Sequence, residues 1–405
     1  MTARAALAPD PLADLTPETL NETYARLRET APVHWSRAFG AWVLTRHADG
    51  MAVLADSTFL ADDPVARFDR LEQRGGPASP NLRTVLSNVA FFTNPPLHTQ
   101  LRKFMFRLFQ GMDVKVMRPA LEQQVRAFLR AAKRDGGFEL AAGYGNDLAL
   151  FAIRTLLGLP SEGAAGLAAT AREVAWIFDL TPRSMREFRR AEVHAGELLD
   201  YFEPRIAASR AGSDEGRFSQ LVGRSDSELE LSDRELAGLL TFIFSGGLET
   251  TAMGIAASAL MLLEHDDLRA RLIAEPDRIP GAAREFLRLA TPFQYVARIA
   301  SREAEIGGRA IAAGERVNVI LGAANRDPAA FPDPDAIDLD RRGPDSLVFG
   351  HGAYRCLGAG LAQMETEVAI AAVLANPDLR LAPGSVAWEK QMRVPAMTRA
   401  WAEFA

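Results

Sequence analysis

The sequence predicts a mainly α-helical protein with a minor β region. Apolar residues recur at the three- and four-residue spacing of a helix through most of the chain. One stretch, Leu236 to Leu263, is apolar over 28 residues apart from a single charge at Glu249. Short strand-like segments occur near both ends, and Gly307-Gly308 is a hairpin signal between two of them. A length of 405 residues alone suggests two or three domains, but no strong linker interrupts the middle, so one large domain is the alternative.

The elements follow from these patterns in order. Residues 1–16 are rich in Ala, Pro and Asp and are expected to be flexible. Besides the long apolar stretch, helical periodicity predicts helices over Pro17–Thr30, His98–Phe109, Asp113–Asp135, Asp147–Leu157, Gly163–Asp179, Ser184–Arg210, Pro280–Ala290 and about Gly358 to Ala375. Strands are predicted over Val33–Arg37, Ala41–Thr45, Ile299–Ile306, Arg309–Ala312 and Arg316–Ile320, with a β-rich tail over Leu379–Phe404. The polar stretches Ala61–Asn81 and Ala211–Ser232 are predicted to be surface loops.

The long apolar stretch has the length and hydropathy of a transmembrane helix. Against that interpretation, four glycines and several Ser and Thr residues lower its hydrophobicity. Ser232, with Glu235 three residues later, has the pattern of a helix N-cap. No second stretch of this kind exists in the sequence. We therefore predict the buried central helix of a soluble protein without a membrane partner.

Composition excludes several functions. The net charge of −6 argues against a nucleic-acid partner, because such proteins usually carry a basic surface. The N-terminus lacks the basic start and apolar core of a signal peptide, so we expect a cytoplasmic protein, and a monomer. One cysteine in 405 residues excludes an intrachain disulfide and any zinc or iron–sulfur site that needs several cysteines.

That single cysteine, Cys356, lies in the run Phe349-Gly350-His351-Gly352-Ala353-Tyr354-Arg355-Cys356-Leu357-Gly358, just before a helical pattern. Backbone N–H groups without partners and the positive end of a helix dipole stabilise a thiolate at such a position. The glycines allow the backbone to approach something large and flat. A thiolate here could be a nucleophile or the axial ligand of a haem iron. An inert, buried cysteine in a turn is the alternative.

The long apolar stretch carries a second informative segment, Gly246-Gly247-Leu248-Glu249-Thr250-Thr251. A glycine in a helix costs about 1 kcal/mol relative to alanine, so a pair of them indicates a packing or functional requirement. A single carboxylate in the middle of an apolar helix also requires an explanation. A structural helix, with Glu249 in a salt bridge and Thr250 bonded back to its own backbone, is the alternative.

Taken together, these segments resemble the cytochrome P450 family. Phe349, Gly352, Cys356 and Gly358 match the spacing of the family's haem-ligand loop, and Glu249-Thr250 is similar to its acid–alcohol pair. The resemblance implies the cytochrome P450 fold, with haem b between the long central helix and the cysteine-loop helix and Cys356 as the axial thiolate ligand. It covers nearly the whole chain and implies one haem domain over residues 17–405.

The resemblance also implies roles for individual residues. Glu249 would supply protons and Thr250 would hold dioxygen by a hydrogen bond. Further haem contacts are implied for His98, Arg102, Arg298, Phe349, Gly350, Tyr354, Gly358 and Gly247. Among these, His98, Arg102 and Arg298 are expected to meet the haem carboxylates. Tyr354 departs from the family pattern, because many relatives carry His or Arg two residues before the cysteine and a phenol brings no charge.

Two more groups of residues are assigned by the resemblance. Glu285 and Arg288, three apart on one helix face, are similar to the family's buried Glu–Arg pair, which a later arginine, Arg341 or Arg342, completes. Substrate contacts are expected from Phe242, Ser245, Gly246, Phe293, Gln294, Tyr295, Val296 and Met397, and from Trp176–Phe178. Most of these side chains are apolar, which suits a hydrophobic substrate.

The expected function is that of a bacterial-type haem-thiolate monooxygenase of secondary metabolism. It would insert one atom of dioxygen into a hydrophobic small molecule, by hydroxylation or epoxidation. Electrons would come from a separate ferredoxin or flavodoxin and its reductase, steered by the positive stretch from Arg102 to Arg118, which includes Lys103, Arg107 and Lys115. The alternatives are a peroxide-driven hydroxylase or isomerase of the same fold, a gas-binding sensor, and a helical scaffold without haem.

Overall fold

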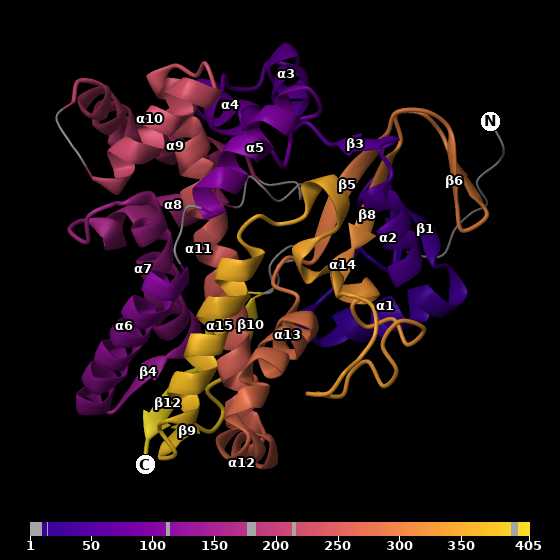
Figure 1. The fold of residues 1–405 in the computed structure, drawn as a ribbon. Helices are drawn as coiled ribbons and strands as arrows, with labels where there is room; N and C mark the ends of the chain where they lie inside the picture. Colours follow the sequence, from indigo (N-terminus) through magenta and orange to yellow (C-terminus); the bar gives the residue numbers. More distant parts are fainter. Residues whose placement is uncertain (1–9, 14, 111–113, 176–183, 213–215, 390–395) are drawn as a thin grey trace. The chain divides into compact units, whose positions relative to one another are not determined.

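The computed structural model describes residues 10–13, 15–110, 114–175, 184–212, 216–389 and 396–405. Helices dominate and the strands form small sheets, as predicted (Figure 1). The chain divides into two units. The first comprises residues up to 62, 284–356 and 386–398, and the second comprises residues 63–283, 357–385 and 399–405.

The first unit is built on a five-stranded sheet with the order β1-β2-β8-β5-β3. Its strands are β1 (Val33–Ser36), β2 (Ala41–Leu44), β8 (Arg316–Ile320), β5 (Tyr295–Ala300) and β3 (Phe59–Ala61). The β2–β8 pair is parallel, with Val43 opposite Asn318, and the other pairs are antiparallel. The unit also contains α1 (Pro17–Thr30), α2 (His47–Ala55), α14 (Leu321–Ala324), and the strand pairs β6 (Ala304–Ile306) with β7 (Arg309–Ile311) and β10 (Ala387–Glu389) with β11 (Ala396–Arg399). Helix α13 (Ile279–Ala290) leads into this unit from the second.

The segment predicted to be flexible over residues 1–16 is packed in its described part. Leu12 and Leu15 are buried in an apolar cluster with Tyr24 of α1 and Tyr295 of β5. The carboxylate of Asp10 accepts hydrogen bonds from the backbone N–H groups of Leu12 and Ala38 and from the Ser36 hydroxyl. These contacts correct the prediction for Asp10 onward, because two leucines give the segment apolar surface to bury.

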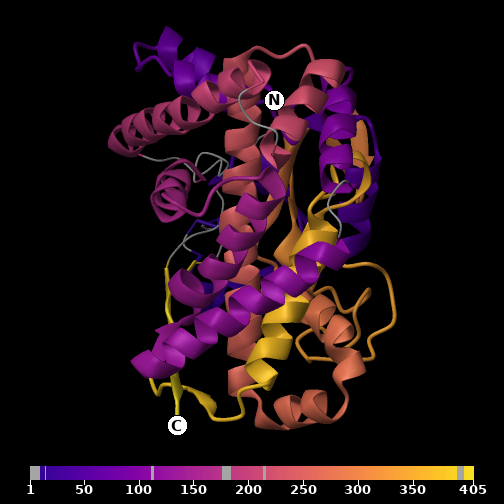
Figure 2. The same ribbon diagram turned by 60° about the vertical axis from the view of Figure 1, so that its left-hand side comes forward.

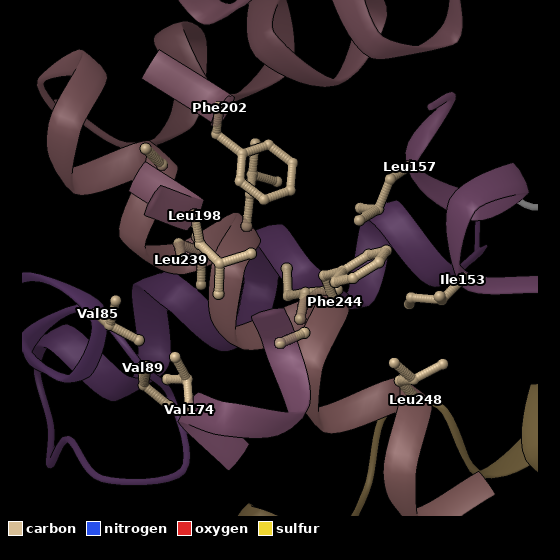
Figure 3. Close-up of a cluster of buried hydrophobic side chains, with 14 of the residues drawn as sticks. Val85, Val89, Ile153, Leu157, Val174, Leu198, Phe202, Leu239, Phe244 and Leu248 are labelled. Atoms are coloured by element: carbon tan, nitrogen blue, oxygen red, sulfur yellow. The ribbon is translucent and has the colours of Figure 1, made fainter. Parts of the chain in front are cut away.

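The second unit is a helical bundle around α11 (Asp233–Glu264). Its other helices are α3 (Val65–Gln73), α4 (Pro80–Ser87), α5 (Leu97–Gln110), α6 (Val114–Asp135), α7 (Asn146–Leu157), α8 (Ala164–Ala175), α9 (Met185–Arg210), α10 (Arg217–Glu228), α12 (Asp266–Ala274) and α15 (Ala359–Leu374). The unit also has a small sheet, formed by β4 (Gly137–Glu139), β12 (Trp401–Phe404) and β9 (Leu379–Leu381). Helices α11 and α15 lie side by side in both views (Figures 1 and 2). The core joins Leu239 and Phe244 of α11 to Phe202 of α9 and Leu157 of α7 (Figure 3). Burying a side chain of this size contributes about 1.5–3 kcal/mol.

Two predicted loops contain helices. Ala61–Asn81 contains α3 and the start of α4, and Ala211–Ser232 contains α10. In α3 the apolar residues are few but stand on one face, with Phe68 packed edge-on against Phe188 of α9. The predicted strand Ile299–Ile306 is also interrupted, because β5 ends at Ala300 and β6 begins at Ala304. Short polar helices such as α3 and α10 depend on tertiary packing, which their own sequence does not show.

Helix α11 begins where its cap pattern predicts. The Ser232 hydroxyl accepts the Glu235 backbone N–H at 3.3 Å, and the Glu235 carboxylate accepts the Ser232 N–H at 2.9 Å. Among the described helices, α11 is the one long and apolar enough to span a membrane, and 61% of its most apolar window is buried inside the protein. That burial agrees with the predicted core helix.

Candidate active site

The cysteine loop of the first unit is bent by two glycines. Gly350 and Gly352 both have a φ of +68°, a left-handed conformation that glycine adopts without strain. A Cβ atom on Gly352 would stand 2.3 Å from the carbonyl oxygen of Leu54 in α2, so this position also requires glycine for space. The backbone N–H of Cys356 donates to the Phe349 carbonyl at 2.8 Å. The loop thus returns on itself and leaves Cys356 exposed, three residues before α15 begins.

Arg298 of β5 is a buried cation near this loop in the same unit. Its side chain is 2% exposed, donates to the Ala297 carbonyl at 2.8 Å and lies over the Tyr354 ring at 4.4 Å. No carboxylate among the described residues forms an ion pair with it. Burial lowers the pKa of Arg298 to about 10, so it stays charged at neutral pH. A buried cation without a protein carboxylate fits a bound group that brings its own, as haem does.

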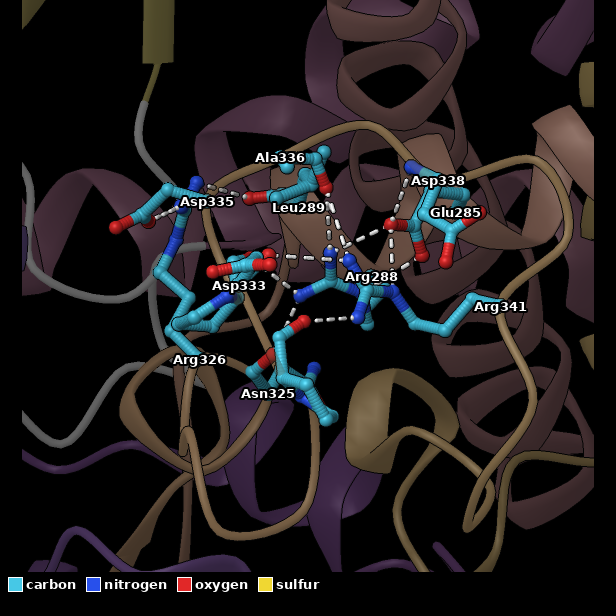
Figure 4. A network of polar contacts seen from close by, with 12 residues as sticks. Glu285, Arg288, Leu289, Asn325, Arg326, Asp333, Asp335, Ala336, Asp338 and Arg341 are labelled. Carbon is cyan, nitrogen blue, oxygen red and sulfur yellow. Dashed lines mark hydrogen bonds and ion pairs between the residues drawn. The ribbon is translucent and has the colours of Figure 1, made fainter.

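A second buried arginine is fully paired within the protein. Arg288 of α13 forms two hydrogen bonds to the Glu285 carboxylate, at 2.7 and 2.8 Å. Arg341 donates to the same carboxylate at 2.8 Å, so Arg341 rather than Arg342 completes the predicted pair (Figure 4). Burial alone would raise the pKa of Glu285, but the hydrogen bonds from Arg288 and Arg341 hold it below its usual value. The three side chains form a structural cluster.

Asn325 joins this cluster to the cysteine loop. Its carbonyl oxygen accepts a hydrogen bond from Arg288 at 2.7 Å, and its side-chain oxygen accepts the Leu347 N–H at 2.6 Å. Leu347 opens the 3₁₀ turn Leu347–Phe349 at the start of the loop. The sequence showed Asn325 only as part of a polar motif, because its contacts lie 22 and 37 residues away along the chain. It positions the loop without being a candidate for chemistry.

In the second unit, several candidate residues of α11 form a partly exposed stripe on a helix that is mostly buried. Phe242, Gly246, Glu249, Thr250 and Met253 all retain exposure. They recur at intervals of three and four residues, so they share one side of the helix. The Thr250 hydroxyl donates to the Gly246 carbonyl at 2.9 Å, which is the back-bond foreseen in the structural alternative. Helix α11 is continuous through this segment.

The two glycines of α11 face different surroundings. A Cβ on Gly246 would meet no described atom within 4 Å, whereas one on Gly247 would lie 2.9 Å from Cδ1 of Ile153 in α7. Gly247, predicted to contact the haem, is therefore required for helix packing in this structure, and Gly246 faces the open side. No local motif indicated Gly145, where a Cβ would lie 2.3 Å from the carbonyl oxygen of Ala252, two residues beyond Thr250. Gly145 closes a π-turn, Leu140–Gly145, that supports α11 here.

The predicted carboxylate-binding residues of this unit lie on α5. His98 is buried and Arg102, one turn later, is partly exposed. Farther along α5, Lys103 and Arg107 are exposed beside Phe106, which is 48% exposed. Arg118 of α6 forms an ion pair with Glu367, so it contributes less positive charge than the sequence indicated. Asp113 lies outside the described residues, as does the side chain of Lys115.

The predicted substrate contacts divide into two groups. Phe242 and Phe293 are partly exposed, whereas Ser245, Val296 and Met397 are buried. Tyr295 belongs to the apolar core of the first unit and packs against Phe39. Gln294 is buried and donates to the Thr291 carbonyl. Tyr295, the first residue of β5, and Gln294 just before it are thus packed inside the first unit in this structure. Trp176–Phe178 lies outside the described residues.

The mainly helical fold and the glycine-bent loop with its exposed thiol fit the haem-thiolate class of enzymes. Comparison with known proteins supports the same class. The family model described as Cytochrome P450 matches residues 176–399. Cytochrome P450-SU2 of Streptomyces griseolus is 34% identical over 391 residues, which cover 94% of this chain and 91% of that protein. The biotin biosynthesis cytochrome P450 of Bacillus subtilis (strain 168) is 30% identical over 362 residues, 89% of each chain.

The chain therefore belongs to the cytochrome P450 family and is a bacterial-type P450 monooxygenase. A solved structure agrees with the fold. The P450BioI structure, in complex with an acyl carrier protein ligated to hexadec-9Z-enoic acid, matches with a TM-score of 0.86 and 27% identity, covering 96% of this chain and 99% of that one. The family uses a haem-thiolate cofactor in general, and the buried cation Arg298 and the exposed Cys356 fit such a group.

Proposed function

We propose that this enzyme binds haem b through the thiolate of Cys356 and inserts one oxygen atom into an apolar small molecule, by hydroxylation or epoxidation. The observation that carries the proposal is the single thiol, exposed by a loop whose bends require Gly350 and Gly352. Membership of the cytochrome P450 family supports the same assignment.

The charged residues supply the cofactor's counter-ions. Arg298, a buried cation without a protein carboxylate among the described residues, is the strongest candidate for a haem carboxylate. The phenol ring of Tyr354 holds its guanidinium in place by a cation–π contact. His98 and Arg102, one turn apart on α5, are proposed for the same function. Phe349, Gly350 and Gly358 would shape the loop around the thiolate.

When bound, haem with a thiolate ligand supplies the activation of dioxygen. The hydroxyl of Thr250 has one donor and two acceptor sites, and its donor is engaged by the Gly246 carbonyl. It therefore offers lone pairs on the partly exposed side of α11, where it can accept a hydrogen bond from a water molecule or another protonated ligand. Glu249, the adjacent carboxyl, is proposed to pass protons to that position.

The electrons are proposed to come from a separate ferredoxin or flavodoxin and its reductase. The exposed side chains Lys103, Phe106 and Arg107 on α5 combine positive charge with apolar surface, which suits an acidic redox protein. We propose further that residues 17–405 act as one haem domain, in a cytoplasmic monomer.

The substrate is proposed to be a long acyl chain delivered on a carrier protein. The support is the likeness to P450BioI, which was solved with an acyl carrier protein that bears hexadec-9Z-enoic acid. An unbranched apolar chain also agrees with Phe242 and Phe293 as partly exposed candidate contacts.

The absorption spectrum of the dithionite-reduced protein under carbon monoxide tests the cofactor assignment. Wild type is expected to show the strongly red-shifted Soret band of thiolate-ligated haem, and Cys356→Ala is expected to lose it. A wild-type band at the position of histidine-ligated haem would contradict thiolate ligation. Absence of haem after supplementation during expression would overturn the monooxygenase and favour the helical scaffold.

A further inference from the structure

The N-terminal half of α9 has an outward face that combines apolar and cationic side chains. Met185 and Val193 are 39% and 60% exposed, and Arg186 and Arg189 are exposed with them. Met185, Arg189 and Val193 follow one another at intervals of four residues, so they lie along one side of the helix. The opposite side is buried, as Phe188, Ala191 and Ala195 show. We call the four exposed residues the α9 face.

The two arginines of the α9 face have no ion-pair partner among the described residues. Other side chains on the same helix have such partners, since Arg190 forms an ion pair with Glu173 and His194 lies 2.9 Å from Glu197. A local positive charge on a chain of net charge −6 attracts an acidic partner. Met and Arg are enriched in protein interfaces, and exposed apolar residues flanked by charge mark such surfaces.

We propose that the α9 face is the docking surface for a small acidic carrier protein that delivers the acyl chain. The inference rests on the carrier-bound substrate proposed above. Carboxylates of the carrier would pair with Arg186 and Arg189, and an apolar patch of it would cover Met185 and Val193. A redox protein is assigned elsewhere, to Lys103, Phe106 and Arg107 of α5. Helix α9 packs directly on α11, which carries Thr250, so the carrier would dock on a helix adjacent to the one that bears the candidate residues.

The test measures the dissociation constant of the haem-loaded enzyme for an acyl carrier protein that bears hexadec-9Z-enoic acid, by calorimetry at low and high salt. Arg186→Glu/Arg189→Glu is expected to weaken binding by about tenfold or more and to remove most of its salt dependence. The variant should fold, because both positions are exposed and Arg186→Glu places its acidic residue in the first turn of α9, which the helix dipole favours. Met185→Ser/Val193→Ser is expected to weaken binding without changing the salt dependence.

Arg130→Glu/Arg134→Glu is the matched control. Both residues are exposed on α6, and their substitution changes the net charge by the same amount. The control is expected to bind the carrier nearly as wild type does. Equal loss in the control and in the α9 variant would overturn the proposal, because only net charge would then matter. Absence of carrier binding to wild type would also overturn it, as would an α9 variant that slows ferredoxin-driven reduction but keeps carrier affinity.

Free hexadec-9Z-enoic acid separates this proposal from the proposed function. Its binding, followed by the Soret shift, is expected to be the same in wild type, the α9 variants and the control. If neither the free acid nor the loaded carrier shifts the Soret band of wild type while the carrier binds through the α9 face, the docking surface stands and the substrate assignment fails. If the free acid binds and is oxidised but the carrier does not bind, the docking surface fails alone.

Discussion

The guanidinium of Arg298 lies over the phenol ring of Tyr354, with 4.4 Å between its Cζ atom and the ring centroid. Tyr354 stands two residues before Cys356, at the position where the sequence departs from the family's usual His or Arg. A His or Arg at this position would bring a charge of its own, whereas the phenol ring of Tyr354 contacts a neighbouring charge. It positions a neighbouring cation, and burial raises the pKa of its own hydroxyl despite the adjacent Arg298.

Tyr354→Ala is expected to weaken haem retention, whereas Tyr354→Phe is expected to preserve it. The alanine variant loses the ring that holds Arg298, a contact of about 0.5–2 kcal/mol, which corresponds to about 2- to 30-fold faster haem loss. Phenylalanine keeps the ring and loses only the hydroxyl. The measurement is the rate of haem transfer to an excess of apomyoglobin. If both variants lost haem equally fast and faster than wild type, the hydroxyl rather than the ring would be what matters; rates equal to wild type in both would contradict any role of Tyr354 in haem retention.

Arg341→Ala is expected to lower the free energy of unfolding by about 3 kcal/mol, because it removes a partner from the buried Glu285 carboxylate. Its guanidinium also donates to the carbonyls of Pro332 and Asp333. Arg342→Ala, at the exposed neighbouring position, is the control and is expected to change stability by less than about 0.5 kcal/mol. Urea denaturation followed by circular dichroism provides both values. A similar loss in both variants would contradict the assignment of Arg341 to the cluster.

The sequence predicted the elements whose signals are local. The cap of α11 depends on Ser232 and Glu235, which are three residues apart, and the structure has it as predicted. The choice between Arg341 and Arg342 depended instead on Glu285, more than 50 residues earlier, and no local pattern determines it. Which of Gly246 and Gly247 faces open space likewise depends on Ile153, in another helix. Residue types and spacing thus identified the candidate residues. Which of them are packed and which are exposed was decided by contacts with residues far away in the sequence.

Gly246→Ala and Gly247→Ala are expected to have opposite effects on stability. The added methyl group at Gly246 faces open space, so better helix propensity should stabilise the ligand-free protein by up to about 1 kcal/mol. At Gly247 the methyl group meets Ile153, and the variant should lose about 1–3 kcal/mol. Thermal unfolding gives the comparison. Turnover should fall in Gly246→Ala despite its stability, and unchanged turnover would exclude this face of α11 from the active site.

Thr250→Ala is expected to retain haem and substrate binding but to release several-fold more hydrogen peroxide per electron pair consumed. The hydroxyl that accepts a hydrogen bond on the open side of α11 is lost, while the helix keeps its backbone bonds. Thr250→Ser should stay close to wild type. Thr251→Ala is the matched control at the next position and should also remain coupled. Product and peroxide are measured against NADH oxidation with a reconstituted redox chain, and tight coupling in Thr250→Ala would contradict the role proposed for this hydroxyl.

Glu365 of α15 predicts a specific dependence of stability on pH. The carboxyl is 3% exposed, one of its oxygens has no hydrogen-bond partner among the described residues, and burial raises its pKa well above the usual value. The folded protein therefore keeps this proton at a pH where the unfolded chain has released it. The contribution of the protonated Glu365 carboxyl to the free energy of unfolding is fully present below the pKa of the unfolded chain, about 4.3. It is lost as pH rises toward the higher pKa of the folded protein, by at most about 1.4 kcal/mol per pH unit.

Glu365→Gln removes the titration and keeps the size of the side chain. The variant is expected to be more stable than wild type at pH 8, and the difference should shrink steadily as pH falls toward 5. Glu264→Gln, at the exposed end of α11, is the control and should follow the wild-type profile. Urea denaturation midpoints at one-unit intervals from pH 5 to 8 provide the measurement. A constant difference between Glu365→Gln and wild type across this range would mean that Glu365 is already ionised in the folded protein.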